Sequence, residues 1–507
     1  MISRVDSFVL QGIDAIACEI EADLSPVGLP KTTIVGLPDI AVKESMERVR
    51  TALLNSGFRF PQSRLTINLA PADVRKEGPV YDLPIALALL AADGTIEPAA
   101  SGTGRAGEYL IAGELALDGR VRFIKGGTSL AMLARRLEKR GVIVPRENAG
   151  EAAAVEGIEV LGVSTLGEVV QFLNGRLALG PHPPIDADTL LAQARPEVDF
   201  ADIRGQEAAK RALTVAAAGA HNMLMIGPAG TGKTMMAKAL PGVLPPLTRQ
   251  EALEVTRIYS SVGQIPRDQP LMLARPVRAP HHTASAPAII GGGSIPRAGD
   301  VSLAHRGVLF LDEMPEFSRA VLETLRQPLE DGYVTVARAH GSVRFPARFM
   351  LVGALNPTAK GRAVADEVSQ RAMERYLSRI SAPLIDRIDI HVEVPAVSYK
   401  QLTSKQPGTD SATIRRRILE ARAVQRQRQG PRPNAELSGK ALNRHARLDD
   451  AAQTLLGQAM TELGLSARAY DKVRRVGRTI ADLEGCESVQ VHHIAEAVQY
   501  RLLDRAV

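Results

Sequence analysis

Tryptophan is absent from this chain of 507 residues, and cysteine is nearly so. Only Cys18 and Cys486 occur, far apart, which argues against a disulfide framework and a cysteine zinc site and predicts a reducing, cytoplasmic location. No run approaches the ~20 apolar residues of a membrane span. The first residues also lack the basic segment and long apolar run of a signal peptide. We therefore expect a chain that is neither exported nor inserted into a membrane.

Hydrophobic residues make up 45% of the chain, and its length is enough for two to four domains. Residues 1–175 mix β-rich and helical runs, which predicts one α/β domain. The proline-rich stretch 176–198 is predicted to be a linker. Over 199–395 buried strands alternate with helices, which predicts a parallel sheet. Residues 396–507 are predicted to be helical.

Residues 227–234, GPAGTGKT, match the phosphate-binding pattern G-x-x-x-x-G-K-[ST] at every position. A short apolar run before them predicts a strand, and the residues after them predict a helix. In that setting the glycines let backbone N–H groups turn toward phosphate oxygens. Lys233 is predicted to meet the β- and γ-phosphates of ATP, and the Thr234 hydroxyl to ligate Mg²⁺. The predicted nucleotide-binding loop consists of Gly227, Pro228, Ala229, Gly230, Thr231, Gly232, Lys233 and Thr234.

Two further strand ends carry polar residues. The apolar run before Asp312 and Glu313 predicts a strand that ends in two carboxylates. Asp312 is predicted to bind the nucleotide's Mg²⁺, directly or through water, and Glu313 to polarise the attacking water. The alternative is a solvated strand end. A third apolar run ends in Asn356, which resembles the sensor-1 position of AAA+ ATPases, where a polar side chain helps to hold that water. The alternative is a turn asparagine before Pro357.

Two arginines complete the predicted catalytic set. Arg387 lies where the arginine finger falls in related ring ATPases, and a finger stabilises transition-state charge in the neighbouring subunit. The alternative is an arginine paired with Asp386 or Asp389. Arg468 lies in the first turn of a predicted amphipathic helix and suits a sensor-2 role in its own subunit. A surface arginine is the alternative there.

The motifs GPAGTGKT, VRAPHHTASAPAIIGGG, SLAHRGVLFLDEMPEFSRAVLETLRQPLEDG, GALNP and APLIDRIDIHVEVP resemble the YifB/ComM family of magnesium-chelatase-like AAA+ ATPases. The N-terminal run VGLPDIAVKESMERVRTALLNSGF is similar to the same family, so the resemblance covers nearly the whole chain. It implies an N-terminal Lon-protease-like α/β domain, an AAA+ core and a helical lid over 396–507. It also implies a homo-hexameric ring that unwinds DNA and aids branch migration in natural transformation. The segment after Asn356-Pro357 lacks the cysteine cluster common in relatives, so a zinc-stabilised loop is not expected.

Contacts with DNA are predicted to be led by phosphate rather than by base stacking. The net charge is +6, and aromatic residues make up only 4% of the chain. Two short strand-like runs around residues 338–341 predict a hairpin whose Arg338, His340 and Arg344 could meet phosphates. The glycine-rich segment 275–297, with Arg278, is a second candidate. The alternative is that both segments are ordinary solvated turns.

The N-terminal domain resembles a protease fold that works through a serine nucleophile and a lysine base. In that alignment Val80 takes the serine position and Thr128 lies nearest the lysine position, so peptidase chemistry is not expected. The charges of the loop, Asp73, Arg75, Lys76, Glu77 and Asp82, become candidates for contacts between subunits or with DNA. A chelatase-type motor that remodels a protein partner is the alternative function, and an ATP-dependent protease is a weaker one.

Overall fold

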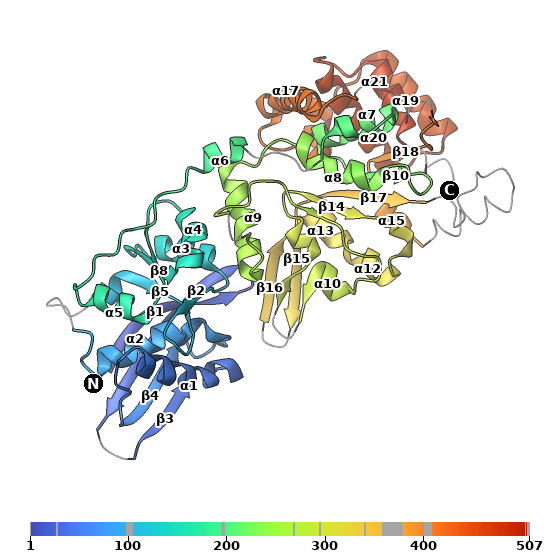
Figure 1. The fold of residues 1–507 in the computed structure, drawn as a ribbon. Helices are drawn as coiled ribbons and strands as arrows, with labels where there is room; N and C mark the ends of the chain where they lie inside the picture. Colours follow the sequence, from blue (N-terminus) through green and yellow to red (C-terminus); the bar gives the residue numbers. More distant parts are fainter. Residues whose placement is uncertain are drawn as a thin grey trace. The chain divides into compact units, whose positions relative to one another are not determined.

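The computed structural model of this chain describes residues 2–26, 29–97, 105–193, 198–266, 269–293, 296–338, 341–356, 379–399, 408–501 and 503. The chain forms two compact units, which are described one at a time below (Figure 1). Unit 1 contains Met1–Leu191, Thr248–Leu273 and Pro296–Ala298. Unit 2 contains Ala192–Leu247, Ala274–Ile295 and Gly299–Val507.

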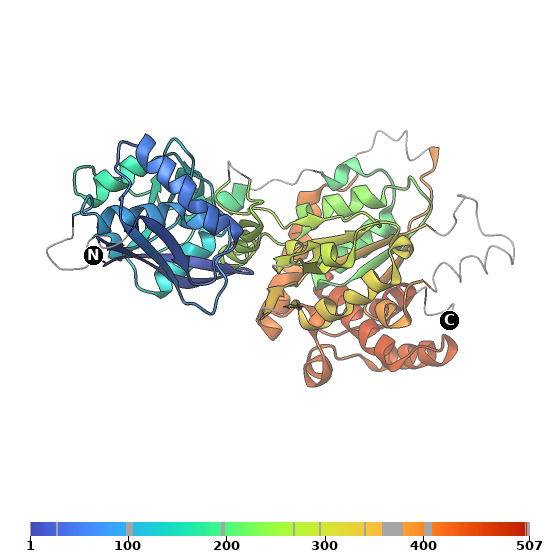
Figure 2. The same cartoon turned by 90° about the horizontal axis from the view of Figure 1, so that it is seen from below.

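Unit 1 combines two sheets with helices. The larger sheet has the order β1-β2-β4-β3, with only β3 and β4 parallel, and β5-β8-β9 form a smaller parallel sheet. Helix α2 packs against β1 and β2, and α1 packs on α2 (Figure 2). The strands are β1 (Ile2–Gln11), β2 (Asp14–Ser25), β3 (Lys31–Val35), β4 (Arg64–Ala70), β5 (Tyr109–Ile111), β6 (Glu114–Leu115), β7 (Val121–Arg122), β8 (Gly141–Pro145), β9 (Glu159–Val163) and β13 (Arg297–Ala298). The helices are α1 (Ile40–Asn55), α2 (Asp82–Ala92), α3 (Gly127–Arg136), α4 (Ala149–Ala153), α5 (Leu166–Leu173), α6 (Ala187–Gln193, at the change of unit) and α9 (Arg249–Val262).

The charged loop before α2 is partly internal. Asp82 is fully buried and accepts hydrogen bonds from Arg48 Nε at 2.9 Å and Nη2 at 3.1 Å. Lys76 is fully buried too, and its ammonium donates to the carbonyl oxygen of Pro71. Removing either partner of a buried charged pair destabilises the fold, so such a side chain is not free to contact another molecule. The prediction that Lys76 and Asp82 contact other subunits or DNA is therefore wrong, whereas Arg75 remains exposed.

Helix α9 is the least expected part of unit 1. It follows α8 of unit 2 along the chain, yet it packs on α3. Arg257 of α9 donates from Nε to the carbonyl oxygen of Ile13 at 2.9 Å, and its guanidinium pairs with Asp14. The amide of Gly126 donates to the Ser260 carbonyl at 3.1 Å. The segment next to the P-loop helix in sequence thus belongs to the N-terminal unit in space.

Unit 2 is built on the predicted parallel sheet, with the order β11-β14-β17-β10-β18. Its three central strands are buried along their whole length, as expected for a sheet covered on both faces. An antiparallel hairpin of β15 and β16 extends from this unit (Figure 1). The strands are β10 (Met223–Ile226), β11 (Val277–Arg278), β12 (Gly291–Gly292), β14 (Val308–Leu311), β15 (Tyr333–Arg338), β16 (Gly341–Pro346), β17 (Met350–Leu355) and β18 (Ile390–Glu393).

The helices of unit 2 fall into a core set and a C-terminal set, here called the lid. The core set is α7 (Glu207–Gly219), α8 (Lys233–Val243), α10 (Ala286–Ile290), α11 (Asp300–Leu303), α12 (Arg319–Thr324), α13 (Arg326–Asp331) and α15 (Ala382–Ile385). The lid helices are α17 (Ser411–Gln429), α18 (Gly439–His445), α19 (Asp450–Glu462), α20 (Ala467–Leu483) and α21 (Val491–Gln499). Helices α17 and α20 both pack on α7. Over the described ranges, none of these helices or those of unit 1 has the length and apolarity needed to cross a membrane.

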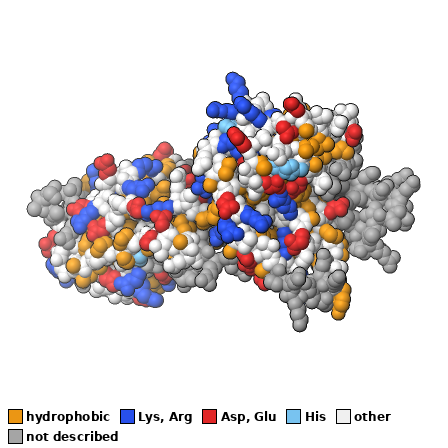
Figure 3. All heavy atoms as spheres, turned by 90° about the horizontal axis from the view of Figure 1, so that it is seen from above, with side chains coloured by type: hydrophobic (Ala, Val, Ile, Leu, Met, Phe, Trp, Pro, Cys, Tyr) orange, Lys and Arg blue, Asp and Glu red, His pale blue; other side chains and the backbone are white. Residues whose placement is uncertain are grey.

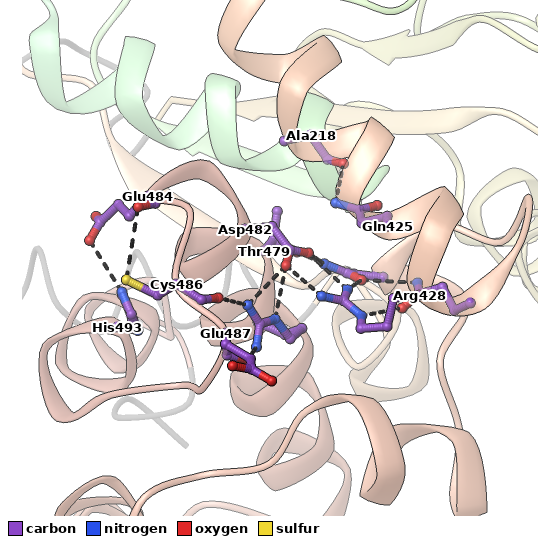
Figure 4. A network of polar contacts seen from close by, with 12 residues as sticks. Ala218, Gln425, Arg428, Thr479, Asp482, Glu484, Cys486, Glu487 and His493 are labelled. Carbon is purple, nitrogen blue, oxygen red and sulfur yellow. Dashed lines mark hydrogen bonds and ion pairs between the residues drawn. The ribbon is translucent and has the colours of Figure 1, made fainter.

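A polar network joins the lid to the core (Figure 4). Asp482 of α20 accepts from Arg428 Nη1 at 2.6 Å and from Arg478 Nε at 3.0 Å. Thr479 lies 2.8 Å from His221 Nε2, and Gln425 Nε2 donates to the Ala218 carbonyl at 3.1 Å. Because Asp482, Arg478 and Thr479 are buried and hydrogen-bonded, they fix the orientation of α20. The basic helix α17 thus uses one of its arginines, Arg428, to bond to α20.

His391 lies inside β18 and is fully buried. Neither of its ring nitrogens has a hydrogen-bond partner within the described part of the chain. Burial, with nearby Arg501 and Lys472, holds the pKa of His391 well below its ordinary value. The folded chain therefore keeps this ring neutral where the unfolded chain takes up a proton.

This difference predicts a pH dependence of stability. As the pH falls below about 6.5, the unfolded state gains a proton at His391 that the folded state lacks, so the free energy of unfolding should fall by up to ~1.4 kcal/mol per pH unit. In the apolar variant His391→Leu, the free energy of unfolding should change less per pH unit between pH 5 and 7. Urea titrations across that range measure the slopes. Equal slopes for the variant and the natural chain would contradict the prediction.

Candidate active site

The carboxyl ends of three neighbouring strands bring the predicted nucleotide-binding residues together. β14, β17 and β10 are neighbours in the sheet of unit 2. They lead into Asp312, Asn356 and the P-loop, residues 227–234. Open α/β sheets bind ligands at this edge. The topology alone thus gathers side chains that lie far apart in the sequence.

The P-loop uses glycine where the backbone demands it. A Cβ at Gly227 would lie 2.0 Å from the carbonyl oxygen of Val394, so no larger residue fits. Gly232 has a φ of 89°, a left-handed conformation that glycine adopts readily. α8 begins at the next residue, Lys233. The loop therefore ends on a helix N-terminus, whose free N–H groups favour phosphate.

Lys233 lies folded against the loop that carries it and is 6% exposed. Its Nζ donates to the carbonyl oxygens of Gly227 and Pro228, both at 2.7 Å, and to Asn356 Oδ1 at 3.0 Å. Burial lowers the pKa of Lys233, although the two nearby carboxylates act in the opposite direction. The ammonium is thus held at the site by oxygen acceptors, and the phosphate oxygens of a nucleotide can take their place.

Asp312 and Thr234 lie together as magnesium binding requires. The Thr234 hydroxyl donates to Asp312 Oδ2 at 2.9 Å. The backbone amide of Glu313 donates to Asp312 Oδ1 at 3.0 Å. Glu313 itself has a φ of 49°, a left-handed conformation that is uncommon outside glycine and often found at functional sites.

Asn356 connects the lysine to the second carboxylate. Its Oδ1 accepts from Lys233, and its Nδ2 donates to Glu313 Oε1 at 3.3 Å. His282 approaches the same carboxylate from the segment after β11, with Nδ1 at 3.8 Å from Glu313 Oε2. In the sequence, His282 is predicted only as part of the segment 275–297, the second candidate for contact with DNA. Its distance from Glu313 was not predictable, because no local pattern marks it.

The two predicted arginines lie close to each other and contact other groups than the P-loop. Arg387 pairs with Glu330, and its Nη1 donates to the Pro383 carbonyl at 2.5 Å. Burial, with nearby Arg468, lowers the pKa of Arg387. Arg468 Nη1 lies 3.2 Å from Asp386, next to Arg387 in the chain. Arg387 is thus not paired with Asp386 or Asp389, which is the alternative that the sequence leaves open.

The structure describes only some of the residues that are predicted to contact DNA. Arg344 is exposed in β16, and its guanidinium lies 4.1 Å from the centre of the Tyr333 ring. Arg278 is bound within unit 2, with Nη2 at 2.7 Å from Asp300. The side chain of Arg338, His340 and the segment 357–378 without cysteine lie outside the described residues.

The two positions that the sequence aligns with the protease serine and lysine carry neither residue. Val80 packs against the apolar core, and Thr128 is fully buried. The Thr128 hydroxyl donates to Glu151 Oε2 at 3.0 Å. Burial raises the pKa of Glu151, which Thr128 and Asn148 oppose through hydrogen bonds. The position aligned with the protease lysine thus holds a buried threonine bonded to a carboxyl group.

One lid cluster has the composition of a metal site, but its hydrogen bonds occupy both ring nitrogens of one histidine. The ligand atoms of Glu484, His492 and His493 lie within 4.8 Å of one another. However, His493 Nδ1 accepts from the Gln490 amide at 2.9 Å, so the neutral ring carries its proton on Nε2. That nitrogen lies 3.2 Å from Glu484 Oε2 (Figure 4). A ring that donates to the carboxylate has no lone pair for a metal there.

The fold and this site define a magnesium-chelatase-like AAA+ ATPase. The family described as "Magnesium chelatase, subunit ChlI" matches residues 199–402. "Subunit ChlI of Mg-chelatase" matches 20–148, and "Magnesium chelatase, subunit ChlI C-terminal" matches 408–501. The predicted fold class is therefore confirmed.

Relatives that match over nearly the whole chain identify the family within this class. The chain is 44% identical to the competence protein ComM of Haemophilus influenzae over 97% of its own length and 96% of the relative's. It is 41% identical to the protein YifB of Escherichia coli, over 99% and 98%. A magnesium-chelatase 38 kDa subunit of Rhodobacter capsulatus is 27% identical over 62% of this chain and 89% of that subunit. The chain belongs to the YifB/ComM family of magnesium-chelatase-like AAA+ ATPases.

Members of this class use ATP with Mg²⁺, and the residues at the strand ends fit both. The Thr234 hydroxyl and an Asp312 carboxylate oxygen meet at 2.9 Å, and hard oxygen donors are what Mg²⁺ prefers. The P-loop presents its N–H groups and Lys233 beside them. The predicted cofactors are confirmed by the family.

Two substitutions should separate binding from hydrolysis. Lys233→Ala removes the buried charge on the loop and should abolish ATP binding. Glu313→Gln keeps the shape of the side chain, so ATP should still bind while kcat falls by roughly 10²–10⁴. Titration with a fluorescent ATP analogue and phosphate release measure the two effects. Glu313→Gln with unchanged kcat would remove Glu313 from the catalytic role.

Proposed function

We propose that this protein is an ATP-driven hexameric ring motor that acts on DNA as a helicase or branch-migration factor in natural transformation. The observation that carries the proposal is the 44% identity, over nearly the whole of both chains, to a protein named for competence. An ATPase site alone does not select a substrate, because the same fold serves many functions. The full-length match is what favours DNA over other substrates.

The site residues suggest how hydrolysis proceeds. Lys233 and the P-loop amides orient the phosphates, while Thr234 and Asp312 would hold the metal. Bound Mg²⁺ supplies positive charge that neutralises the β- and γ-phosphate oxygens. Glu313 polarises the attacking water, and Asn356 fixes the carboxylate through its 3.3 Å contact with Oε1.

The arginines support a ring. Arg387 and Arg468 lie side by side at Asp386, and their described contacts are with residues other than the P-loop of the same chain. Arg387 is proposed to leave Glu330 and reach the γ-phosphate of a neighbouring subunit. Arg468 as a sensor 2 in its own subunit stays a prediction, which requires that it leave Asp386.

The β15–β16 hairpin is the proposed DNA contact. Its base is fixed by buried Val334, Val336 and Phe345, while Arg344 projects to solvent. On the face drawn in Figure 3, basic and acidic side chains are interspersed. Contact through Arg344 on a fixed hairpin is therefore proposed, rather than contact through a broad basic patch on that face.

A chelatase-type motor acting on a protein partner is the second candidate. The Rhodobacter capsulatus subunit supports it, but that match covers 62% of this chain. An ATP-dependent protease is disfavoured, since Val80 and Thr128 offer neither the serine nor the lysine of such an enzyme.

Forked DNA should separate these candidates. It should raise the ATPase rate several-fold, and added salt should weaken the effect because phosphate contacts release counterions. Arg344→Glu should reduce the stimulation and leave the basal rate unchanged. The matched charge reversal Arg176→Glu, at an exposed arginine of unit 1, should change neither. An ATPase rate that DNA does not alter would contradict the helicase proposal.

Loss of the proposed finger should impair turnover without impairing binding. Arg387→Ala should lower kcat by ~10³ or more, the usual effect of losing an arginine finger, while the affinity for ATP stays unchanged. Phosphate release at a protein concentration that supports assembly measures kcat. Full activity in Arg387→Ala would show that this arginine is not the finger.

A further inference from the structure

The segment 386–389, which carries Arg387 between α15 and β18, is held by its backbone from several directions. All four of its carbonyl oxygens accept a hydrogen bond from a side chain elsewhere in unit 2. Asn222 Nδ2 donates to Arg387 O at 3.0 Å. Lys472 Nζ donates to Asp386 O and, at 3.3 Å, to Ile388 O. Arg501 Nη1 donates to Ile388 O at 2.7 Å and to Asp389 O at 3.3 Å.

Two of these donors are buried cations. Lys472 is 5% exposed and Arg501 is 1% exposed. Burying a charge is costly unless it is paired and hydrogen-bonded, so such cations are seldom incidental. The carboxylate of Asp389 lies in the same region and bonds to His221 Nδ1 at 3.0 Å. Against the effect of burial, that bond and the charge of Lys472 hold the pKa of Asp389 below its ordinary value.

Both cations belong to the lid. Lys472 is on α20, and Arg501 follows α21. The same helix α20 is fixed to the core through Thr479, which lies 2.8 Å from His221. Any displacement of α20 therefore moves Lys472, one of the donors that hold the backbone of segment 386–389.

We propose that Lys472 and Arg501 are positioning residues for Arg387, so that the lid of one subunit sets the position of its arginine at the neighbouring subunit's nucleotide. This inference rests on the proposed action of Arg387 in a neighbouring subunit. The cations touch only the backbone of the segment, and their effect on hydrolysis passes through Arg387.

Single variants give the first test. Lys472→Met removes the charge and keeps the length of the side chain, and kcat of the assembled protein should fall roughly 10²-fold, the effect of a small misplacement of a catalytic group. The affinity for a fluorescent ADP analogue should stay the same, and Lys472→Arg should recover part of kcat. The matched control is Arg474→Met, which removes another buried cation of α20 whose contacts are within the lid. It should leave kcat within a few-fold of the natural chain.

Mixed assemblies give the decisive test, because a general folding defect cannot be rescued by a partner. Lys472→Met subunits keep an intact P-loop, while Lys233→Ala subunits keep an intact Arg387. Mixing the two should restore ATPase activity above the sum of the separate proteins, since each supplies what the other lacks at a shared site. A mixture of Arg387→Ala with Lys233→Ala should behave in the same way.

The outcomes separate the inference from the proposed function. If the Arg387→Ala mixture recovers activity and the Lys472→Met mixture does not, Lys472 does not position the finger, and the ring mechanism stands. If neither mixture recovers, the action of Arg387 on a neighbouring subunit is contradicted and the inference falls with it. If Arg474→Met alone loses as much activity as Lys472→Met, the effect belongs to the lid as a whole and the inference fails.

Discussion

The geometry of the motor depends on the amide side chain of Asn222. Its Oδ1 accepts from the Leu351 amide at 2.8 Å, and its Nδ2 donates to Arg387 O at 3.0 Å. Its own carbonyl accepts from the amides of Asp389 and Ile390. One residue at the start of β10 therefore sets the register of β17 and β18 beside it. The positions of Asn356 and of Arg387 relative to the P-loop follow from that register, because each lies on or beside one of these strands.

The resulting site is a short series of contacts between charged and polar side chains. Lys233, Asn356 and Glu313 are linked in series, and Thr234 meets Asp312 beside them. An ammonium, an amide and carboxylates lie within hydrogen-bond distance of one another. This arrangement prepares the edge of the sheet for a polyphosphate and its metal. Such fixed groups stabilise charge without having to reorganise during the reaction. Unit 2 thus provides the ATPase chemistry, and the hairpin and Arg387 are its proposed contacts with DNA and with the next subunit.

Much of the fold and the P-loop could be predicted because the signals are local. Residues 227–234 match a pattern of eight consecutive positions, and apolar runs mark the strands on which Asp312 and Asn356 follow. The role of Asn222 could not be predicted, since its partners lie 129 and 165 residues away. Helix α9 was also unexpected: it continues the motor's sequence but belongs to unit 1, because α3 is what covers it. Charges on the loop before α2 suggested a surface, yet Asp82 is internal.

We propose a ring in which one subunit completes the active site of the next while DNA occupies the centre. The most direct test is cryo-electron microscopy of the Glu313→Gln protein with ATP and forked DNA, since slow hydrolysis should hold the assembly in one state. We expect a six-membered ring with a DNA strand in contact with the β15–β16 hairpins, and with Arg387 at the γ-phosphate of the neighbouring subunit. Single subunits, or a ring with DNA outside it and Arg387 still paired with Glu330, would contradict it.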